Sequence, residues 1–218
     1  MSTVGTPAEA RSAVRSPVEG IGVGRSPAEK TSAVGAPAEG ASAVGTPVER
    51  VGEVGPSAEG VSAVRTLIVL RHAKAAQVPG LPDQDRPLTD RGERDAKRAG
   101  EEIRTLGLVP DLVLCSPAQR TRRTAELAFP AVETDYERMI YQAWAEEILE
   151  LIRRLDPEHR TVVLCGHNPG ALDLALLLTG GDYGFRPGAF AVIRIESEWT
   201  ELGPGGGALV TVWDPRDD

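Results

Sequence analysis

The sequence predicts an α/β fold: a three-layer α/β/α sandwich with a mostly parallel central sheet, preceded by a disordered repeat tail. Two observations lead to this prediction. From residue 64 onward, short apolar runs typical of strands buried on both faces alternate with segments of helical periodicity. Residues 1–63 are instead built from one short repeated unit. Since strands that alternate with helices pair in parallel through right-handed crossovers, we expect helices on both faces of the sheet.

The repeat tail has a period of ten residues. Each unit resembles Val-Gly-Thr-Pro-Ala-Glu followed by small residues, and the segment contains no aromatic side chain. Proline recurs at positions 7, 17, 27, 37 and 47, and glutamate at 9, 19, 29, 39, 49 and 59. Solenoid repeats have about twenty residues or more and a patterned apolar face. These units bury too little surface to offset the entropy of ordering, so we expect disorder or transient helical turns.

The change in character near residue 64 predicts two regions, a low-complexity segment 1–63 and a folded domain 64–218. The segment could be a flexible tether or partner-binding arm, or it could have no specific role. A third hypothesis is that Val64 begins the native protein, because a valine codon can serve as a bacterial start. The intact mass of the native protein tests this third hypothesis, and a mass that starts at residue 1 excludes it.

The composition argues against nucleic-acid and membrane partners. The chain has 218 residues and a net charge of −8, of which residues 1–63 carry −2, and no basic stripe is present. The longest apolar stretch, from Ala171 to Leu178, is too short to span a bilayer. The amino terminus lacks the apolar core of a signal peptide. With only Cys115 and Cys165, each ending an apolar run, the chain is expected to be a reduced cytoplasmic protein.

The first predicted strand organises the domain. Its apolar residues, Thr66 to Leu70, are followed directly by Arg71 and His72. Ligands of open α/β sheets bind at the carboxyl ends of the strands, so these two side chains would be presented at a binding edge. Taken alone, an arginine and a histidine after a strand are more typical of an ordinary solvated turn, so the case for a site depends on the rest of the chain.

The next elements follow from caps and periodicity. Thr89 is a good N-cap for an amphipathic helix over residues 90–106, which Gly107 would end. A second strand at residues 112–115 meets Ser116, the expected N-cap of a helix with Arg120 in its first turn. That position allows the guanidinium and the free backbone N–H groups of the helix to bind one anion.

The remaining elements complete the alternation. We expect a weak strand at 131–134, a helix carrying Ile148 to Leu155 that ends by Pro157, a buried strand at 161–165 and an apolar helix at about 171–178. Three later strands, at 188–196, 199–202 and 209–213, would close the edge of the sheet. The strand at 161–165 ends in Gly166 and His167, so a second histidine is presented at a strand end.

Strand ends therefore bring two histidines and two arginines to one edge. Arg71 and Arg120 would bind a tetrahedral dianion, since arginine stays protonated and binds phosphate oxygens in pairs. His72 beside such a clamp could attack phosphorus and form a phosphohistidine, which water would then hydrolyse. The arginines would stabilise charge on the transferring group, chiefly in the transition state. The predicted ligand is phosphate.

Four stretches in this order carry a resemblance to a known family. They are residues 71–74 (Arg-His-Ala-Lys), 86–92 (Arg-Pro-Leu-Thr and then glycine), 116–125 (Ser-Pro and then Arg120, Thr124 and Ala125) and 166–170 (Gly-His-Asn-Pro-Gly). From about residue 65 to 214 the chain resembles the histidine phosphatase superfamily, of phosphoglycerate mutase-like fold, in its small SixA-like phosphohistidine phosphatase branch. This branch has alanine where the family signature Arg-His-Gly has glycine. The resemblance implies that His72 is the nucleophile, that Arg71 and Arg120 bind phosphate, and that His167 completes the pocket and stabilises the transferring group.

One family feature is not identified, namely the carboxylic acid with which larger members protonate an alkoxide leaving group. Glu137 lies in roughly the right region, and Asp83 or Asp85 could reach in from the first loop, although each is also compatible with a solvated surface position. The lack of a clear acid favours a leaving group that is easier to expel, such as the imidazole of a phosphorylated protein histidine. The expected partner is therefore a phosphorylated signalling protein, with a small phosphoester as the alternative substrate.

Two further residues are candidate substrate contacts. Lys74 could touch the phosphate, and Arg86 could line the entrance or pair with Asp85. Three histidines without zinc-site spacing, and no glycine-rich nucleotide loop, predict no metal and no cofactor. A different class of function also remains open at this point, a phosphate-binding module that keeps the pocket but turns over negligibly.

Overall fold

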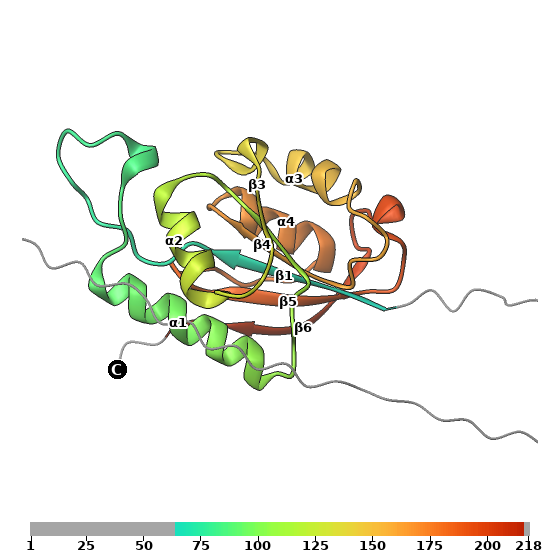
Figure 1. The fold of residues 1–218 in the computed structure, drawn as a ribbon. Helices are drawn as coiled ribbons and strands as arrows, with labels where there is room; N and C mark the ends of the chain where they lie inside the picture. Colours follow the sequence, from blue (N-terminus) through green and yellow to red (C-terminus); the bar gives the residue numbers. More distant parts are fainter. Residues whose placement is uncertain (1–63, 216–218) are drawn as a thin grey trace, which may run out of the picture. The chain divides into compact units, whose positions relative to one another are not determined.

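A twisted sheet forms the centre of the computed structural model (Figure 1), which describes residues 64–215. Within this range six strands pair in the order β3-β2-β4-β1-β5-β6. The strands are β1 (Arg65–Arg71), β2 (Leu112–Cys115), β3 (Thr134–Tyr136), β4 (Thr161–Gly166), β5 (Phe190–Ile195) and β6 (Gly207–Trp213). The first four run parallel, and β5 and β6 add an antiparallel edge beside β1. The repeat segment 1–63, its predicted disorder and the Val64 hypothesis lie outside the described residues.

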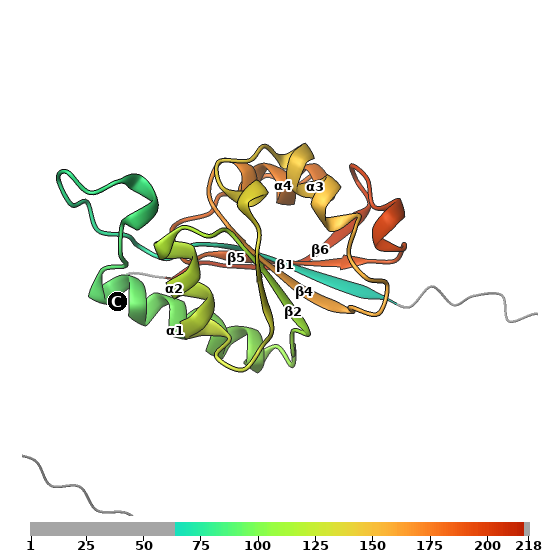
Figure 2. The ribbon, with the colours of Figure 1, turned by 45° about the horizontal axis from the view of Figure 1, so that its top comes forward.

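Helices cover both faces of this sheet. Those of the described chain are α1 (Asp90–Thr105), α2 (Gln119–Ala128), α3 (Ala145–Ile152) and α4 (Gly170–Thr179), with short 3-10 helices η1 (Asp83–Asp85), η2 (Arg138–Ile140) and η3 (Trp199–Glu201). Figure 2 shows α1 and α2 on one face and α3 and α4 on the other. The predicted three-layer α/β/α sandwich with a mostly parallel sheet is therefore confirmed.

The alternation of side chains along β1 explains the two cores. Leu67 and Val69 pack with residues of α3 and α4, whereas Ile68 and Leu70 pack with residues of α1 and α2. All four side chains are fully buried. A strand buried on both faces must be apolar at every position, which is why its sequence shows no alternation of apolar and polar residues.

Element boundaries differ from the sequence expectation at several places. The helix α1 begins as predicted, where the Thr89 side chain accepts a hydrogen bond from the Gly92 N–H. The second helix begins at Gln119 with Ala118 as its N-cap, so the prediction that Ser116 caps it was wrong. The weak strand lies at 134–136 instead of 131–134, and α3 ends at Ile152, before the predicted limit at Pro157.

The prediction of a strand at residues 199–202 was also wrong. Residues Trp199–Glu201 form the 3-10 helix η3. Trp199 and Leu202 are three residues apart, so they lie on the same side of a 3-10 helix, and both are fully buried. The indole N–H of Trp199 donates to the carbonyl oxygen of His159 at 2.9 Å, which fixes the ring in the core.

No helix among residues 64–215 combines the length and the apolar character needed to cross a membrane.

Candidate active site

The carboxyl ends of β1, β2 and β4 lie side by side, and this brings the predicted site together. Arg71 at the end of β1 pairs with Gly166 at the end of β4, and Cys115 of β2 pairs with Cys165 of β4. His72, Ser116 and His167 each follow one of these strand ends. The N–H of His72 donates to the Gly166 carbonyl at 3.0 Å, so the sheet pairing continues into the site.

The orientation of His72 defines the chemistry of its ring. Its Nδ1 lies 2.8 Å from the carbonyl oxygen of Ala73. A carbonyl oxygen only accepts hydrogen bonds, so Nδ1 carries the proton and Nε2 keeps its lone pair. Burial, and after it the positive charges of Arg120 and Arg71, lower the pKa of His72 to about 4, against an opposing effect of the Ala73 hydrogen bond. The imidazole is therefore neutral near pH 7 and has the form that a nucleophile requires.

His167 lies next to His72. The two ring centroids are 5.1 Å apart and the rings are tilted by 58°. The Nε2 atom of His167 is 2.8 Å from the Ser116 hydroxyl, and the edge of the Tyr141 ring contacts the imidazole at a centroid distance of 5.5 Å. Only 8% of the residue is exposed, and burial, followed by the charge of His72, lowers its pKa to about 3. Both site histidines are thus neutral in the ordinary pH range.

Arg71 and Arg120 bring positive charge to these rings. Arg71 donates from Nη1 to the Phe185 carbonyl at 2.7 Å, and burial lowers its pKa. Two buried nitrogens of the site, Nε of Arg71 and Nδ1 of His167, have no hydrogen-bond partner among the described residues. Buried polar groups are normally paired, so the unpaired Nε–H of Arg71 and the unpaired ring nitrogen of His167 indicate a place for an anion.

Helix α2 holds Arg120 and is tied to the loop that carries His72. The Thr124 hydroxyl accepts a hydrogen bond from the Ala73 N–H at 3.0 Å and donates to the Arg120 carbonyl at 2.6 Å. Thr121, which lies between Arg120 and Thr124 on the helix, shares its one hydroxyl hydrogen between the carbonyl oxygens of Ser116 and Ala118. Arg71 and Arg120 are therefore carried by elements that are hydrogen-bonded to each other.

Two glycines allow the loops of the site to pack closely. A Cβ on Gly92, at the start of α1, would lie 2.2 Å from the Lys74 carbonyl oxygen. A Cβ on Gly170, at the start of α4, would lie 2.1 Å from the Ala143 carbonyl oxygen. Real Cβ atoms do not approach backbone so closely, so these positions require glycine. The backbone strain at Gln142, which has a φ of +58°, lies in the same loop as Ala143.

Asp83, on η1 in the loop after β1, reaches into the site. Its Oδ2 accepts hydrogen bonds from Nη2 of Arg120 and from the Tyr141 hydroxyl, both at 2.8 Å. Its Oδ1 accepts from Nη1 of Arg86 at 2.9 Å. The hydrogen bond from Tyr141, followed by those from the two arginines, holds the pKa of Asp83 well below its usual range. Asp83 is consequently a carboxylate near pH 7 and has no proton to give to a leaving group.

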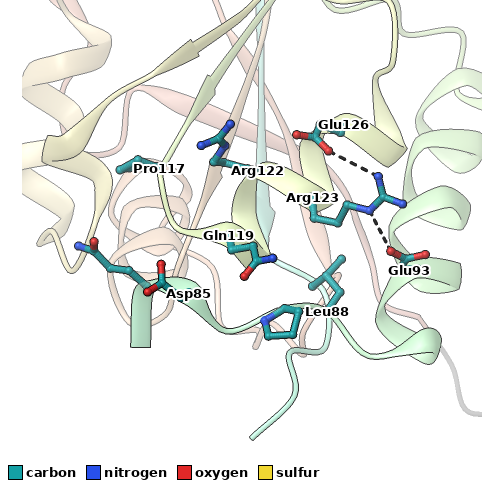
Figure 3. Close-up of a pocket in the computed structure, with 10 residues that line it drawn as sticks. Asp85, Leu88, Glu93, Pro117, Gln119, Arg122, Arg123 and Glu126 are labelled. Atoms are coloured by element: carbon teal, nitrogen blue, oxygen red, sulfur yellow. Dashed lines mark hydrogen bonds and ion pairs between the residues drawn. The ribbon is translucent and has the colours of Figure 1, made fainter. Parts of the chain in front are cut away.

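The other two acids considered from the sequence lie elsewhere. Asp85 lines an outer groove of about 500 Å³ between the loop after η1 and the start of α2. Figure 3 shows this groove, in which Arg123 is held between Glu93 and Glu126 at 2.8 and 3.5 Å. Glu137 follows β3, with a half-exposed side chain, and its backbone N–H donates to the Cys115 carbonyl. Within the described residues, neither carboxylate forms a hydrogen bond or an ion pair with His72 or Arg120.

The two candidate substrate contacts differ in their placement. Arg86 pairs with Asp83, where the sequence had suggested Asp85, and its charge contributes to the low pKa of His72, so it belongs to the entrance of the site. Lys74 is exposed and lines a separate hollow of about 280 Å³ with Arg91 and Arg186. The structure does not bring Lys74 into contact with the histidines, and its role in binding phosphate stays a prediction.

Three residues of the site were missed by sequence reasoning. Ser116 was assigned to a helix cap, whereas its hydroxyl contacts His167. Tyr141 was not singled out, and Thr124 was named only within the stretch 116–125 that carries the family resemblance. Thr124 could have been identified as a site residue, because it is one helical turn after Arg120 and so faces the same side. Ser116 and Tyr141 follow no helical or strand periodicity that would have identified them as site residues.

Among residues 64–215 no group of three or more histidine, cysteine, aspartate or glutamate side chains is arranged to hold a metal ion.

The titration of the two site histidines is a direct test of this geometry. We expect NMR titration of the ring nitrogens to give midpoints at about 4 for His72 and about 3 for His167. In urea both should titrate near the unperturbed value of about 6.5. Because the unfolded chain then binds more protons, these histidines should cost stability progressively as the pH falls from about 6.5 toward 4. Native midpoints near 6.5 would contradict the burial of these rings.

Comparisons with known proteins identify the family of the chain. The sequence profile of the histidine phosphatase superfamily (branch 1) matches residues 67–147. An uncharacterized protein of Mycobacterium tuberculosis is 35% identical over 160 residues, which cover 67% of this chain and 100% of that protein.

Two solved structures show the same relationship in three dimensions. The proposed phosphohistidine phosphatase SixA of Nakamurella multipartitia is 30% identical with a TM-score of 0.67, covering 72% of this chain and 99% of that one. The proposed SixA of Agrobacterium tumefaciens is also 30% identical, with a TM-score of 0.60 and coverages of 69% and 98%. The chain therefore belongs to the histidine phosphatase superfamily, in its SixA-like branch.

Proposed function

We propose that this histidine phosphatase hydrolyses phosphohistidine on a signalling protein through a phosphorylated His72. The observation that carries the proposal is the state of His72: its Nδ1 is held by the Ala73 carbonyl, which leaves Nε2 unprotonated, and its ring lies next to His167 under the positive charges of Arg71 and Arg120. A neutral imidazole nitrogen in a cationic pocket is suited to attack an anionic phosphoryl group.

The reaction would proceed in two transfers. Nε2 of His72 forms a bond to phosphorus while the bond from phosphorus to the substrate nitrogen breaks, and the departing imidazole takes a proton from solvent. Water then attacks the phosphohistidine and releases inorganic phosphate with the return of the lone pair to Nε2. Arg71 and Arg120 would neutralise the phosphoryl oxygens in both steps. His167, hydrogen-bonded to Ser116, would donate from Nδ1 to one of these oxygens.

The state of Asp83 favours phosphohistidine over an ester. Its pKa is depressed, so the acid that reaches into the site is ionised and does not protonate an alkoxide. An imidazole leaving group needs less assistance than an alkoxide. The two SixA structures, each 30% identical to this chain, support the same substrate class.

Phosphate release from two substrates tests the proposal. The full chain would be incubated with a phosphohistidine-bearing carrier protein and, separately, with p-nitrophenyl phosphate. We expect kcat/KM to be at least about tenfold larger for the carrier, equivalent to roughly 1.4 kcal/mol in the transition state. A preference for the ester would move the function to small-molecule phosphomonoester hydrolysis. Release from neither substrate, despite measurable phosphate binding, would favour the phosphate-binding module.

A further inference from the structure

We infer that Asp83 is a positioning residue for Arg120: it orients the guanidinium toward His72 and is neither a general acid nor a lid that competes with phosphate. The inference rests on the proposed function for its catalytic consequence. The orientation of Arg120 by Asp83 can be tested by anion binding, which does not require the protein to turn over any substrate.

Arg120 needs such a partner because its side chain is long and enters the site from the first turn of α2. Nη1 donates to the backbone carbonyl of Asp83, and Nη2 donates to Oδ2 of the same residue. Two atoms of one residue thus bind two nitrogens of one guanidinium. A planar fork held at two points cannot rotate about its long axis, so its orientation is determined by η1.

The hydrogen bonds to Asp83 leave the rest of the guanidinium available. Five N–H groups are present on an arginine, and Asp83 takes one from Nη1 and one from Nη2. Three remain, namely Nε–H and the second N–H of each terminal nitrogen. Since phosphate can accept from these, Asp83 and the substrate can be bound to Arg120 at the same time. This count argues against a competing lid.

Asp83 also connects two sides of the pocket. The hydroxyl of Tyr141 donates to the same Oδ2 that Arg120 contacts. The Tyr141 ring contacts His167 edge-on, and the Arg120 guanidinium lies 6.0 Å from the centre of that ring. One carboxylate oxygen therefore joins α2, which carries Arg120, to the connection that packs on His167.

The charge state of Asp83 matches this role. Three donors, from Tyr141, Arg86 and Arg120, converge on its carboxylate and keep its pKa low. Arg120 has a side chain only 7% exposed, and a buried charge requires a hydrogen-bonded counter-charge. Asp83, 46% exposed, provides that charge from the mouth of the site.

Anion binding measures the role of Asp83 without relying on turnover. Calorimetric titration of the full chain with tungstate, a tetrahedral oxyanion, would be compared for wild type, Asp83→Asn and Asp83→Ala. We expect both variants to bind tungstate about tenfold more weakly, because the guanidinium is no longer oriented. Tighter binding would show a competing lid, and unchanged binding would show that Asp83 does not act on Arg120; either result overturns the inference.

Activity measurements separate positioning from acid catalysis. If Asp83 positions Arg120, Asp83→Asn should lower kcat/KM by a similar factor for the phosphohistidine carrier and for aryl phosphates of different leaving-group pKa. An acid role predicts that the loss grows as the leaving group becomes poorer. The matched control is Asp85→Asn, on the same 3-10 helix but in the outer groove, which should change neither binding nor activity.

A double-mutant cycle distinguishes positioning from a general effect on folding. If Asp83 acts through Arg120, then Asp83→Asn in an Arg120→Ala background should change tungstate affinity less than about twofold. A full additional tenfold loss in that background would overturn the inference. Should wild type hydrolyse no substrate, the proposed function fails, whereas the tungstate measurements still decide whether Asp83 orients Arg120.

Discussion

Replacement of His72 by alanine is expected to reduce phosphate release from any substrate by at least about 10⁴-fold, as is typical when a covalent nucleophile is removed. The other groups of the pocket cannot take over its role. His167 has Nε2 engaged with Ser116, and its ring is held edge-on against Tyr141. Steady-state kinetics on the phosphohistidine carrier and on p-nitrophenyl phosphate would measure the loss.

The intermediate itself provides a second measurement for this variant. Rapid quenching of the wild-type enzyme should trap an acid-labile phosphate on His72, and the His72→Ala protein should trap none. The matched control is His159→Ala, because His159 is far from the site in the turn before β4 and its Nδ1 lies 3.6 Å from the carboxylate of Asp111. That control should keep full activity. A His72→Ala enzyme within tenfold of wild type would exclude nucleophilic attack by this residue.

Much of the fold was predictable because it depends on burial along strands. Residues 67–70 and 162–165 are apolar at every position, which is possible only where both faces of a sheet are covered. The same feature made the centre of the site predictable. Parallel strands end at a common edge, so side chains that follow their last residues must meet there. His72 and His167 were identified in this way, and their rings are indeed neighbours.

The rest of the site depends on conformations that leave no periodic trace in the sequence. Asp83 belongs to a loop of the chain between β1 and α1, and its contact with Arg120 spans 37 residues of sequence. Tyr141 contacts the same carboxylate from 58 residues away. Such contacts depend on how irregular segments close over a sheet edge, and no rule of propensity or spacing decides this. For this reason the sequence indicated three candidate acids, Asp83, Asp85 and Glu137, and no sequence pattern distinguished the one that lies in the site.

The errors in element boundaries have a similar origin. Ser116 followed by Pro117 is a strong local signal for a helix start. In the structure the Ser116 hydroxyl has a tertiary partner, His167, and the helix begins three residues later. Residues 199–202 were expected to form a strand, yet the spacing of three between Trp199 and Leu202 suits the 3-10 helix that forms. Local propensity was overridden in both places by contacts distant in sequence.

Arg120→Ala is expected to lower kcat/KM by about 10³-fold, the scale observed when a preorganised donor to a developing charge is removed. The reason is that Arg120 contributes a buried guanidinium, 7% exposed, beside two neutral histidines. In such an environment its attraction for phosphoryl oxygens is weakly screened. The loss should appear for every phosphorylated substrate, because the interaction is with the phosphoryl group and not with the leaving group.

Arg120→Lys separates charge from geometry. Lysine keeps the positive charge, but a single ammonium cannot contact both the carbonyl and Oδ2 of Asp83 while also binding phosphate in pairs. We therefore expect it to recover no more than about tenfold of the loss seen with alanine. Arg122→Ala is the matched control, since Arg122 is on the same helix but its guanidinium lies over the Tyr136 ring at 4.9 Å. Full activity of Arg120→Lys would show that the pocket uses charge alone, and the orienting contact with Asp83 would then have no catalytic consequence.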